Sequence, residues 1–368
     1  MAILHFCSAL MVAFGLASSA DAGLFNVTNL VTDDQAANPA LITDPNLVNA
    51  WGISRSGTSP FWVSDNGTGV STLYAVNPAT GIPVKQGLTI TIPGNGSVTG
   101  QAFAGSVAGN FNADTFLFVS EDGTVSGWRG ALGTTAEVLQ IGSPANSYKG
   151  AAFANFGGNS YLYAANFLTG NVDVLKGSVG APNLTGSFID PTIPAGYAPF
   201  NVENLGGKIY VTYAKRGAGI DEIDGAGLGF VSVFDLQGNF QSRVATQGTL
   251  NAPWGLALAP GSFGVYAGDL LVGNFGDGRI NVFDLGTDTF VAQLLGSDGN
   301  PIAIDGLWGL IRGSGAGNGG SSQAIYFSAG PNEETHGLFG VITAVPEPAT
   351  LALLGLGVAG LGFSRRKQ

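Results

Sequence analysis

The amino-acid sequence predicts an all-β protein, a six-bladed β-propeller followed by a single C-terminal transmembrane helix. Three observations predict this fold. A short motif returns six times at intervals of about fifty residues, which is typical of propellers and other repeat folds. Each interval contains short β-rich runs separated by turn residues. No helical periodicity longer than two turns occurs before residue 349, so the body has no predicted long α-helix.

The repeated motif is a small or aromatic residue followed by an apolar pair, and three of its six copies contain Trp-Gly. Successive copies are separated by 50, 50, 49, 54 and 54 residues. This regular spacing is the stronger signal, because the residue identities vary from copy to copy. The equivalent positions are Trp51, Gln101, Ala151, Phe200, Trp254 and Trp308.

A β-rich run follows each motif, and further runs complete four short strands per repeat, which is the composition of a propeller blade. The sixth repeat lacks a fourth strand before the chain reaches residue 345. The unassigned run 25–31 would supply this strand and cover an otherwise unpaired edge. A pair of β-sandwiches is the alternative architecture. The runs that follow the motifs are 61–64, 116–119, 161–164, 209–212, 270–272 and 325–327.

Composition limits the class of protein. Of 368 residues, 59 are Gly, and 45% of the chain is hydrophobic, which favours a packed core with many tight turns over disorder. The net charge of −11, without a basic stripe, argues against nucleic acid as a partner. The single cysteine, Cys7, lies in the predicted leader. The mature body therefore has no disulfide, catalytic thiol or Cys-ligated metal.

Residues 1–22 are predicted to be a secretory signal peptide, recognised by the Sec export machinery. Residues 2–17 are mostly apolar, and Ala20-Asp21-Ala22 provides a small-x-small cleavage pattern before Gly23, as in cleaved leaders. The amino-terminal region contains no Lys or Arg. An N-terminal core strand is the alternative interpretation.

The C-terminal segment 345–368 combines three features. Val345-Pro346-Glu347-Pro348 precedes the apolar stretch 349–363, which as a helix would cover about 22 Å, less than the ~30 Å of a bilayer core. Arg365, Arg366 and Lys367 follow immediately and would keep that end in the cytoplasm. Hydrophobicity alone predicts an ordinary tail anchor.

This order of motif, apolar helix and basic tail resembles the PEP-CTERM sorting signal of Gram-negative bacteria. The resemblance covers Val345 to Gln368 and implies processing by the membrane protease exosortase near the Pro-Glu-Pro motif. It further implies transient anchoring in the inner membrane, then a cell-surface or extracellular location linked to exopolysaccharide production. The body, residues 24–344, resembles NHL-type propellers and, with its tail, a family of uncharacterised exported propellers. That resemblance implies a fold but no activity.

Polar residues follow the second strand of most predicted blades. The loops that join the second and third strands should gather around the channel on one face, and five of six place Asp, Asn or Glu at or just after the strand end. Steric needs of tight turns also select Asp-Gly and Asn-Gly, so turn chemistry is the alternative. The candidate ligand-binding residues are Asp65, Asn66, Glu121, Asp122, Asn166, Asn274, Asp277, Glu333 and His336.

The loop of the fourth blade, residues 215–229, is too long for a hairpin turn. It contains Asp221, Glu222 and Asp224, whose carboxylates are hard oxygen ligands suited to Ca²⁺. Their spacing differs from that of an EF-hand. A cation site, a solvated acidic loop and a partner contact are the three interpretations.

The predicted mature chain retains one histidine, His336. A histidine metal cluster is therefore excluded, and a Ser-His-Asp triad would depend on this one residue. No catalytic residue can be assigned, and whether the protein is an enzyme stays open, with the balance against it. The leading hypothesis is non-catalytic binding of a carbohydrate or protein partner. The alternative is an extracellular hydrolase or lyase that acts on polysaccharide or a lactone.

Overall fold

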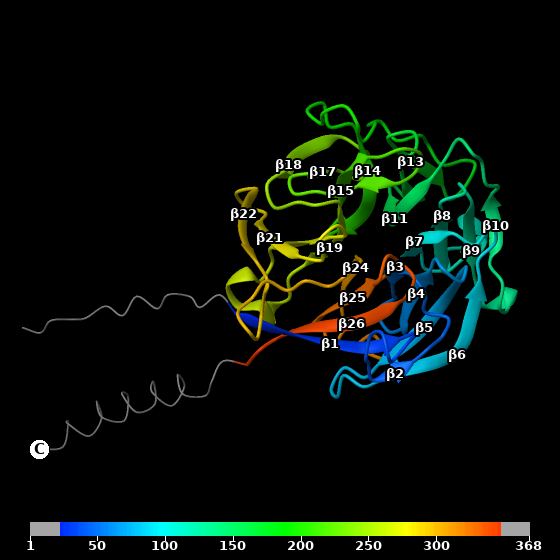
Figure 1. Cartoon of the computed structure of the whole chain (residues 1–368). Helices are drawn as coiled ribbons and strands as arrows, with labels where there is room; N and C mark the ends of the chain where they lie inside the picture. Colours follow the sequence, from blue (N-terminus) through cyan, green and yellow to red (C-terminus); the bar gives the residue numbers. More distant parts are fainter. Residues whose placement is uncertain (1–22, 347–368) are drawn as a thin grey trace, which may run out of the picture.

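The protein is a six-bladed β-propeller, as the sequence predicted (Figure 1). The computed structural model describes residues 23–346. The predicted leader, 1–22, and residues 347–368 of the predicted sorting segment lie outside the described residues. Within residues 23–346 the sequence forms six separate sheets, arranged as a ring in Figure 1. This arrangement replaces the alternative of two β-sandwiches.

Blades one to three follow one another along the chain. Blade one consists of β3 (Ala50–Ser54), β4 (Phe61–Asp65), β5 (Val70–Val76) and β6 (Pro83–Thr91). Blade two consists of β7 (Val98–Phe103), β8 (Phe116–Ser120), β9 (Val125–Trp128) and β10 (Glu137–Gln140). Blade three consists of β11 (Tyr148–Phe156), β12 (Asn159–Asn166) and β13 (Asn171–Lys176).

Blades four to six complete the ring. Blade four contains β14 (Tyr197–Leu205), β15 (Lys208–Arg216), β16 (Glu222–Ile223), β17 (Gly229–Phe234) and β18 (Phe240–Thr246). Blade five contains β19 (Pro253–Leu258), β20 (Leu270–Asn274), β21 (Ile280–Asp284) and β22 (Thr289–Gln293). Blade six contains β24 (Leu307–Arg312), β25 (Ile325–Ala329), β26 (Leu338–Ala344), β1 (Leu24–Thr32) and β2 (Ile42–Thr43), with β23 (Leu295–Gly296) beside β1. Three short 3₁₀ helices, η1 (Phe111–Ala113), η2 (Gly130–Leu132) and η3 (Gly261–Tyr266), lie between strands.

The repeated motif marks the innermost strand of every blade. All six motif positions fall on β3, β7, β11, β14, β19 and β24, which contact one another in turn around the channel. The glycines of the motif allow this close approach. A side chain at Gly100 would place its Cβ 2.4 Å from the Ala151 nitrogen, and one at Gly255 would come 2.7 Å from the Trp308 carbonyl oxygen. The motif therefore repeats in the sequence because the innermost strands of all six blades pack closely around the channel.

The N-terminal strand closes the ring, which confirms the expectation for run 25–31. β1 pairs antiparallel with β26, from Phe25 opposite Ala344 to Thr32 opposite Leu338. Figure 1 shows β1 in blue beside β26 in orange. Blade six is thus made from both ends of the described chain, and its outer edge is covered.

Blade three differs from the predicted four-stranded pattern, because its sheet contains only β11, β12 and β13. The segment 177–196 that follows β13 forms no strand. It contains Pro182, Pro191 and Pro194, which have no N–H to donate to a strand ladder. Its Phe188 nevertheless packs into the hydrophobic cluster between blades three and four, so the segment covers this blade without extending the sheet.

Candidate functional site

The channel mouth, where the innermost strands begin, is built around the buried lysine Lys149. This residue lies on β11 just before Gly150, and its side chain is 2% exposed. Its Nζ forms an ion pair with Oε1 of Glu121, whose side chain is 18% exposed. The ammonium also lies 5.1 Å from the centroid of the Trp51 ring, within the range of a cation–π contact. A buried charge of this kind is stable only because it is paired.

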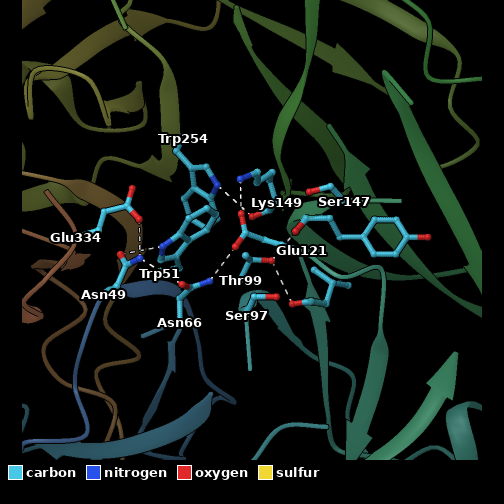
Figure 2. Close-up of polar contacts among 12 residues, drawn as sticks. Asn49, Trp51, Asn66, Ser97, Thr99, Glu121, Ser147, Lys149, Trp254 and Glu334 are labelled. Atoms are coloured by element: carbon cyan, nitrogen blue, oxygen red, sulfur yellow. Dashed lines mark hydrogen bonds and ion pairs between the residues drawn. The ribbon is translucent and has the colours of Figure 1, made fainter. Parts of the chain in front are cut away.

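An asparagine pair connects this ion pair to a second carboxylate (Figure 2). The Asn66 amide donates to Glu121 Oε2 at 3.4 Å, and its own Oδ1 lies 3.3 Å from Asn49 Nδ2. Asn49 Nδ2 also donates to Glu334 Oε2 at 2.7 Å. The loops of blades one, two and six therefore hold the carboxylates of Glu121 and Glu334 in one hydrogen-bonded network.

Asn49 also joins the mouth to the aromatic residues that fill the channel. Its Oδ1 accepts hydrogen bonds from the indole Nε1 of Trp51 at 2.9 Å and of Trp308 at 3.1 Å. The two indole rings stack with centroids 3.7 Å apart, and Phe275 stacks on Trp308 at 4.0 Å. The two indole rings are buried and Phe275 is partly buried, so the rings form the floor beneath the polar groups rather than an exposed platform for a ligand.

The acidic loop of blade four adds negative charge to the mouth. Burial raises the pKa of Glu222 to about 7. The positive charge of Lys149 opposes this rise, and the negative charges of Asp224 and Glu334 add to it. Burial likewise raises the pKa of Glu334, and the charges of Glu121 and Asp221 contribute. The charges of five carboxylates and of Lys149 thus act on one another at the mouth. The mouth carries more negative than positive charge when all of them are ionised.

Four of the predicted ligand-face residues instead hold turns in place, and a fifth, Asp65, is buried with neither carboxyl oxygen hydrogen-bonded to the described residues. Asp65, at the end of β4, is fully buried, and burial raises its pKa well above the usual range. Asp122 accepts hydrogen bonds from the backbone N–H groups of Asn95 and Thr124. Asn166 Oδ1 accepts from the Ser147 and Thr169 N–H groups, Asn274 donates to the Thr249 carbonyl oxygen and to Asp277, and Asp277 accepts from the Arg279 N–H. Turn chemistry explains these four residues.

The remaining predicted residues divide between the mouth and its rim. Asn66 and Glu121 belong to the network. The imidazole of His336 is turned toward Asp33, with Nδ1 at 2.9 Å from Oδ2, although its backbone carbonyl accepts from the Asn49 N–H at 3.0 Å. Glu333 is exposed in the same loop. Sequence reasoning missed Asn49, Lys149 and Glu334; a lysine inside an otherwise apolar inner strand was the signal available for Lys149.

The cation site predicted at Asp221, Glu222 and Asp224 has no support in the geometry. Among residues 23–346, no three His, Cys, Asp or Glu side chains are grouped so that they could hold a metal ion. Asp221 and Glu222 belong to the charge cluster of the mouth. The charge of Asp224 acts on Glu222, and the charge of Asp277 adds to the effect of burial in raising the pKa of Asp224. The geometry favours a solvated acidic loop or a partner contact over the calcium site.

Relatives of this chain include two uncharacterised proteins of Acanthamoeba polyphaga mimivirus. Protein R648 is 33% identical over 327 residues, which cover 83% of this chain and 77% of the relative. This chain belongs to the same family. Protein L690 is also 33% identical, over 81% of this chain and 80% of its own length. Neither name describes an activity, so membership of this family shows common ancestry and does not indicate a function.

The C-terminus matches the PEP-CTERM protein-sorting motif over residues 344–367, which points to export and sorting to the cell envelope. Within the described part of the chain, no helix has the length and apolar character needed to cross a membrane. Among solved structures, a glucose dehydrogenase is similar over 88% of this chain and 99% of its own, with a TM-score of 0.50 and 12% identity. At that identity the likeness shows the fold alone.

Proposed function

We propose that this protein is an exported propeller that is sorted to the cell surface and binds a cationic partner at the acidic channel mouth without catalysis. The observation that carries the proposal is the charge cluster around Lys149, in which Glu121, Glu222 and Glu334 gather around one buried cation. Such a surface favours amino groups over anionic groups. A basic protein segment or an amino-sugar polymer in the extracellular matrix has the required charge.

Several finer expectations form part of this proposal. They are domain limits of 1–22, 24–344 and 345–368, removal of the leader, processing by exosortase, a transient inner-membrane anchor, and a role linked to exopolysaccharide in a Gram-negative cell. The sorting motif at 344–367 supports the export steps. The NHL-like character of the repeats belongs to the same proposal. The propeller fold is compatible with binding and with catalysis alike.

The binding test uses a lysine-rich peptide and glucosamine oligomers, with uncharged dextran for comparison. We expect both cationic probes to bind and dextran not to bind. The variants Glu121→Gln and Glu334→Gln should weaken binding of the peptide at least fivefold. Asp284→Asn is the matched control, because Asp284 ends β21 at the opposite end of the blade and caps a turn there. Equal binding by the mouth variants and the control would refute the proposal.

A second candidate function, hydrolysis of a glycosidic bond, is favoured by the linked carboxylates of Glu121 and Glu334. Burial raises the pKa of Glu334, whereas Glu121 is ion-paired with Lys149. Two carboxyl groups in such different surroundings suit the acid and the base of a glycosidase. Release of reducing ends from a polysaccharide, lost in Glu334→Gln, would establish this function. Intact polysaccharide after prolonged incubation would reject it.

A further inference from the structure

The opposite end of the channel contains a funnel that the predicted sites do not include. Two cavities of about 230 and 290 Å³ lie where the innermost strands end. Both are lined by Arg55, Glu203, Asn204 and Ile311, so they are adjoining parts of one space. A narrow gap along the channel also reaches Glu203. Each cavity is slightly below the ~300–1,000 Å³ of pockets for drug-sized ligands, and suits a molecule about the size of one sugar ring.

Glu203 supplies the first polar group of the funnel. It lies on β14, three positions after Phe200, and lines both cavities and the narrow gap. Its carboxyl group has no hydrogen-bond or ion-pair partner among residues 23–346. Burial raises its pKa to about 8. A carboxyl held neutral in this way can both donate and accept a hydrogen bond, and it does not repel an anion.

Gln101 supplies a second polar group, whose side-chain oxygen is a hydrogen-bond acceptor without a donor. The side chain is 5% exposed and lines the narrow gap and the smaller cavity. Its Nε2 donates to the carbonyl oxygens of Gly52 and Trp62, both at 2.8 Å, which fixes the orientation of the amide. Its Oε1 accepts no hydrogen bond from the described residues. Buried acceptors without a donor are rare in folded proteins, and a ligand hydroxyl would satisfy this one.

Two arginines supply positive charge without a counter-ion. Arg55 and Arg312 both line the larger cavity. Arg55 donates to the carbonyl oxygens of Arg312 and Ser56, and neither guanidinium forms an ion pair among residues 23–346. Burial, and then the charge of Arg312, lower the pKa of Arg55. An anion between the two guanidinium groups would relieve their repulsion and accept charge-assisted hydrogen bonds.

We propose that this funnel is a binding site for a small organic anion that carries hydroxyl groups, of the sugar-acid class. The carboxylate would bind at Arg55 and Arg312, and hydroxyl groups would bind Gln101 Oε1 and Glu203. The apolar face of the ring would lie against wall residues such as Phe153, Leu258 and Ile311. This site is at the other end of the channel from the mouth, so it stands or falls independently of the proposed function.

The other simple ligands fit these groups less well. An inorganic anion would leave the apolar wall and the Gln101 acceptor unused. A neutral sugar would leave the two guanidinium groups without a counter-ion, and an amine would be repelled by them. A molecule with a negative group and hydroxyl groups on one ring engages Glu203, the Gln101 acceptor and the two guanidinium groups, which otherwise donate to backbone carbonyl oxygens.

In the experiment, the purified protein is titrated separately with galacturonate, galactose and acetate, and calorimetry measures the affinity for each. Galacturonate is expected to bind at least tenfold more tightly than galactose or acetate. Arg312→Gln, at an exposed position, should fold normally and weaken galacturonate binding at least fivefold. Arg279→Gln is the control, because Arg279 is an exposed cation in the β20–β21 loop at the mouth end.

Each result decides the proposal. Loss of galacturonate affinity in Arg312→Gln and its retention in Arg279→Gln would support the site. Absence of galacturonate binding, equal affinity for galactose, equal affinity for acetate, or no effect of Arg312→Gln would overturn it. Arg55→Gln provides a second variant of the same guanidinium pair and should give the same loss. Failure of the lysine-peptide assay at the mouth would not affect these outcomes.

Discussion

At the scale of single residues, Lys149 and Glu203 show how the surroundings of an ionisable side chain decide which interactions it makes. Both lie on innermost strands, at opposite ends of the channel. Lys149 is paired with Glu121 and lies over the Trp51 ring, so its charge is compensated inside the protein. Glu203 has no such partner, and burial raises its pKa to about 8. Lys149 organises a network of polar side chains, whereas the Glu203 carboxyl group has no hydrogen-bond partner among the described residues.

Replacing Lys149 should therefore be costly. In Lys149→Met the Glu121 carboxylate loses its cation while the other mouth carboxylates remain, and the free energy of unfolding should fall by about 3 kcal/mol. The double variant Lys149→Met/Glu121→Gln should recover part of that loss, because the uncompensated charge is removed. The exposed Lys176→Met is the control and should change stability by less than about 0.5 kcal/mol. Urea denaturation measures all three; equal effects of Lys149→Met and Lys176→Met would contradict the buried ion pair.

Replacing Glu203 should have the opposite sign and depend on pH. A carboxyl whose pKa is raised on folding, from 4.5 to about 8, costs stability as pH rises between those values, because the unfolded state ionises first. Glu203→Gln removes this cost. The variant should be more stable than the wild type at pH 8, on the order of 2 kcal/mol, and equal to it at pH 4. Denaturation curves at the two pH values test this, and a pH-independent difference would refute the raised pKa.

At the scale of elements, β1 determines whether the ring closes. Phe25 is 1% exposed, and its ring centroid lies 4.5 Å from that of Phe263, in a cluster that joins blades five and six. Val27 on the same strand is 39% exposed. β1 is buried at Phe25 and again over residues 30–32, whereas residues 26–28 are exposed, so both ends of the strand contribute to sealing the sixth blade.

This contrast gives a matched pair of variants. Phe25→Ala should lower the free energy of unfolding by about 3–5 kcal/mol, as for other buried phenylalanines. Val27→Ala should change it by less than about 0.5 kcal/mol. Deletion of residues 24–32 should also cost several kcal/mol by exposing the edge of β26. Thermal or urea unfolding measures each change, and an unaltered midpoint in Phe25→Ala would show that β1 does not close the ring.

The acidic loop that contains β16 supports a further prediction at this scale. Because Asp221, Glu222 and Asp224 form no cluster that could hold a metal, we expect the same melting temperature in calcium and in chelator at matched ionic strength. Binding of calcium to the folded state alone would raise stability by about 2.7 kcal/mol at 100 times its dissociation constant. A calcium-specific rise that disappears in Asp221→Ala would contradict the geometry.

Much of the fold was predictable because close packing around the channel requires a similar motif in the innermost strand of every blade. The motif positions recur every 49–54 residues, and all six lie on innermost strands. A fourth strand was predicted for blade three, and this prediction was wrong. The three prolines in 177–196 indicated that this segment forms no strand. Prolines remove ladder donors, and here this cost outweighs the regularity of the repeat.

The candidate site was less predictable because it depends on contacts between distant blades. Asn166 and Asn274 look like Glu121 in sequence, since each ends or follows a second strand. Only the fold shows that the first two bond their own turns, while Glu121 forms an ion pair with Lys149. Glu203 gave no signal of its own in the sequence, because its burial arises from residues of several blades that line the funnel.

At the scale of the whole molecule, the two ends of the channel differ in charge. Carboxylates gather at the mouth around Lys149, whereas Arg55 and Arg312 line the funnel at the other end. The match of residues 344–367 to a protein-sorting motif begins at the last residue of β26. The ring therefore ends where the sorting segment begins, so removal of the tail would leave the blades complete.

The most direct test of an exported, sorted propeller is intact-mass spectrometry of the protein recovered from outside the cell. We predict a mature chain that starts near Gly23 and ends near the Pro346-Glu347-Pro348 motif, with the apolar stretch 349–363 and the tail Arg365 to Lys367 removed. The same mass should carry all the strands from β1 to β26. Recovery of extracellular protein that still ends at Gln368 would contradict sorting and processing at this motif.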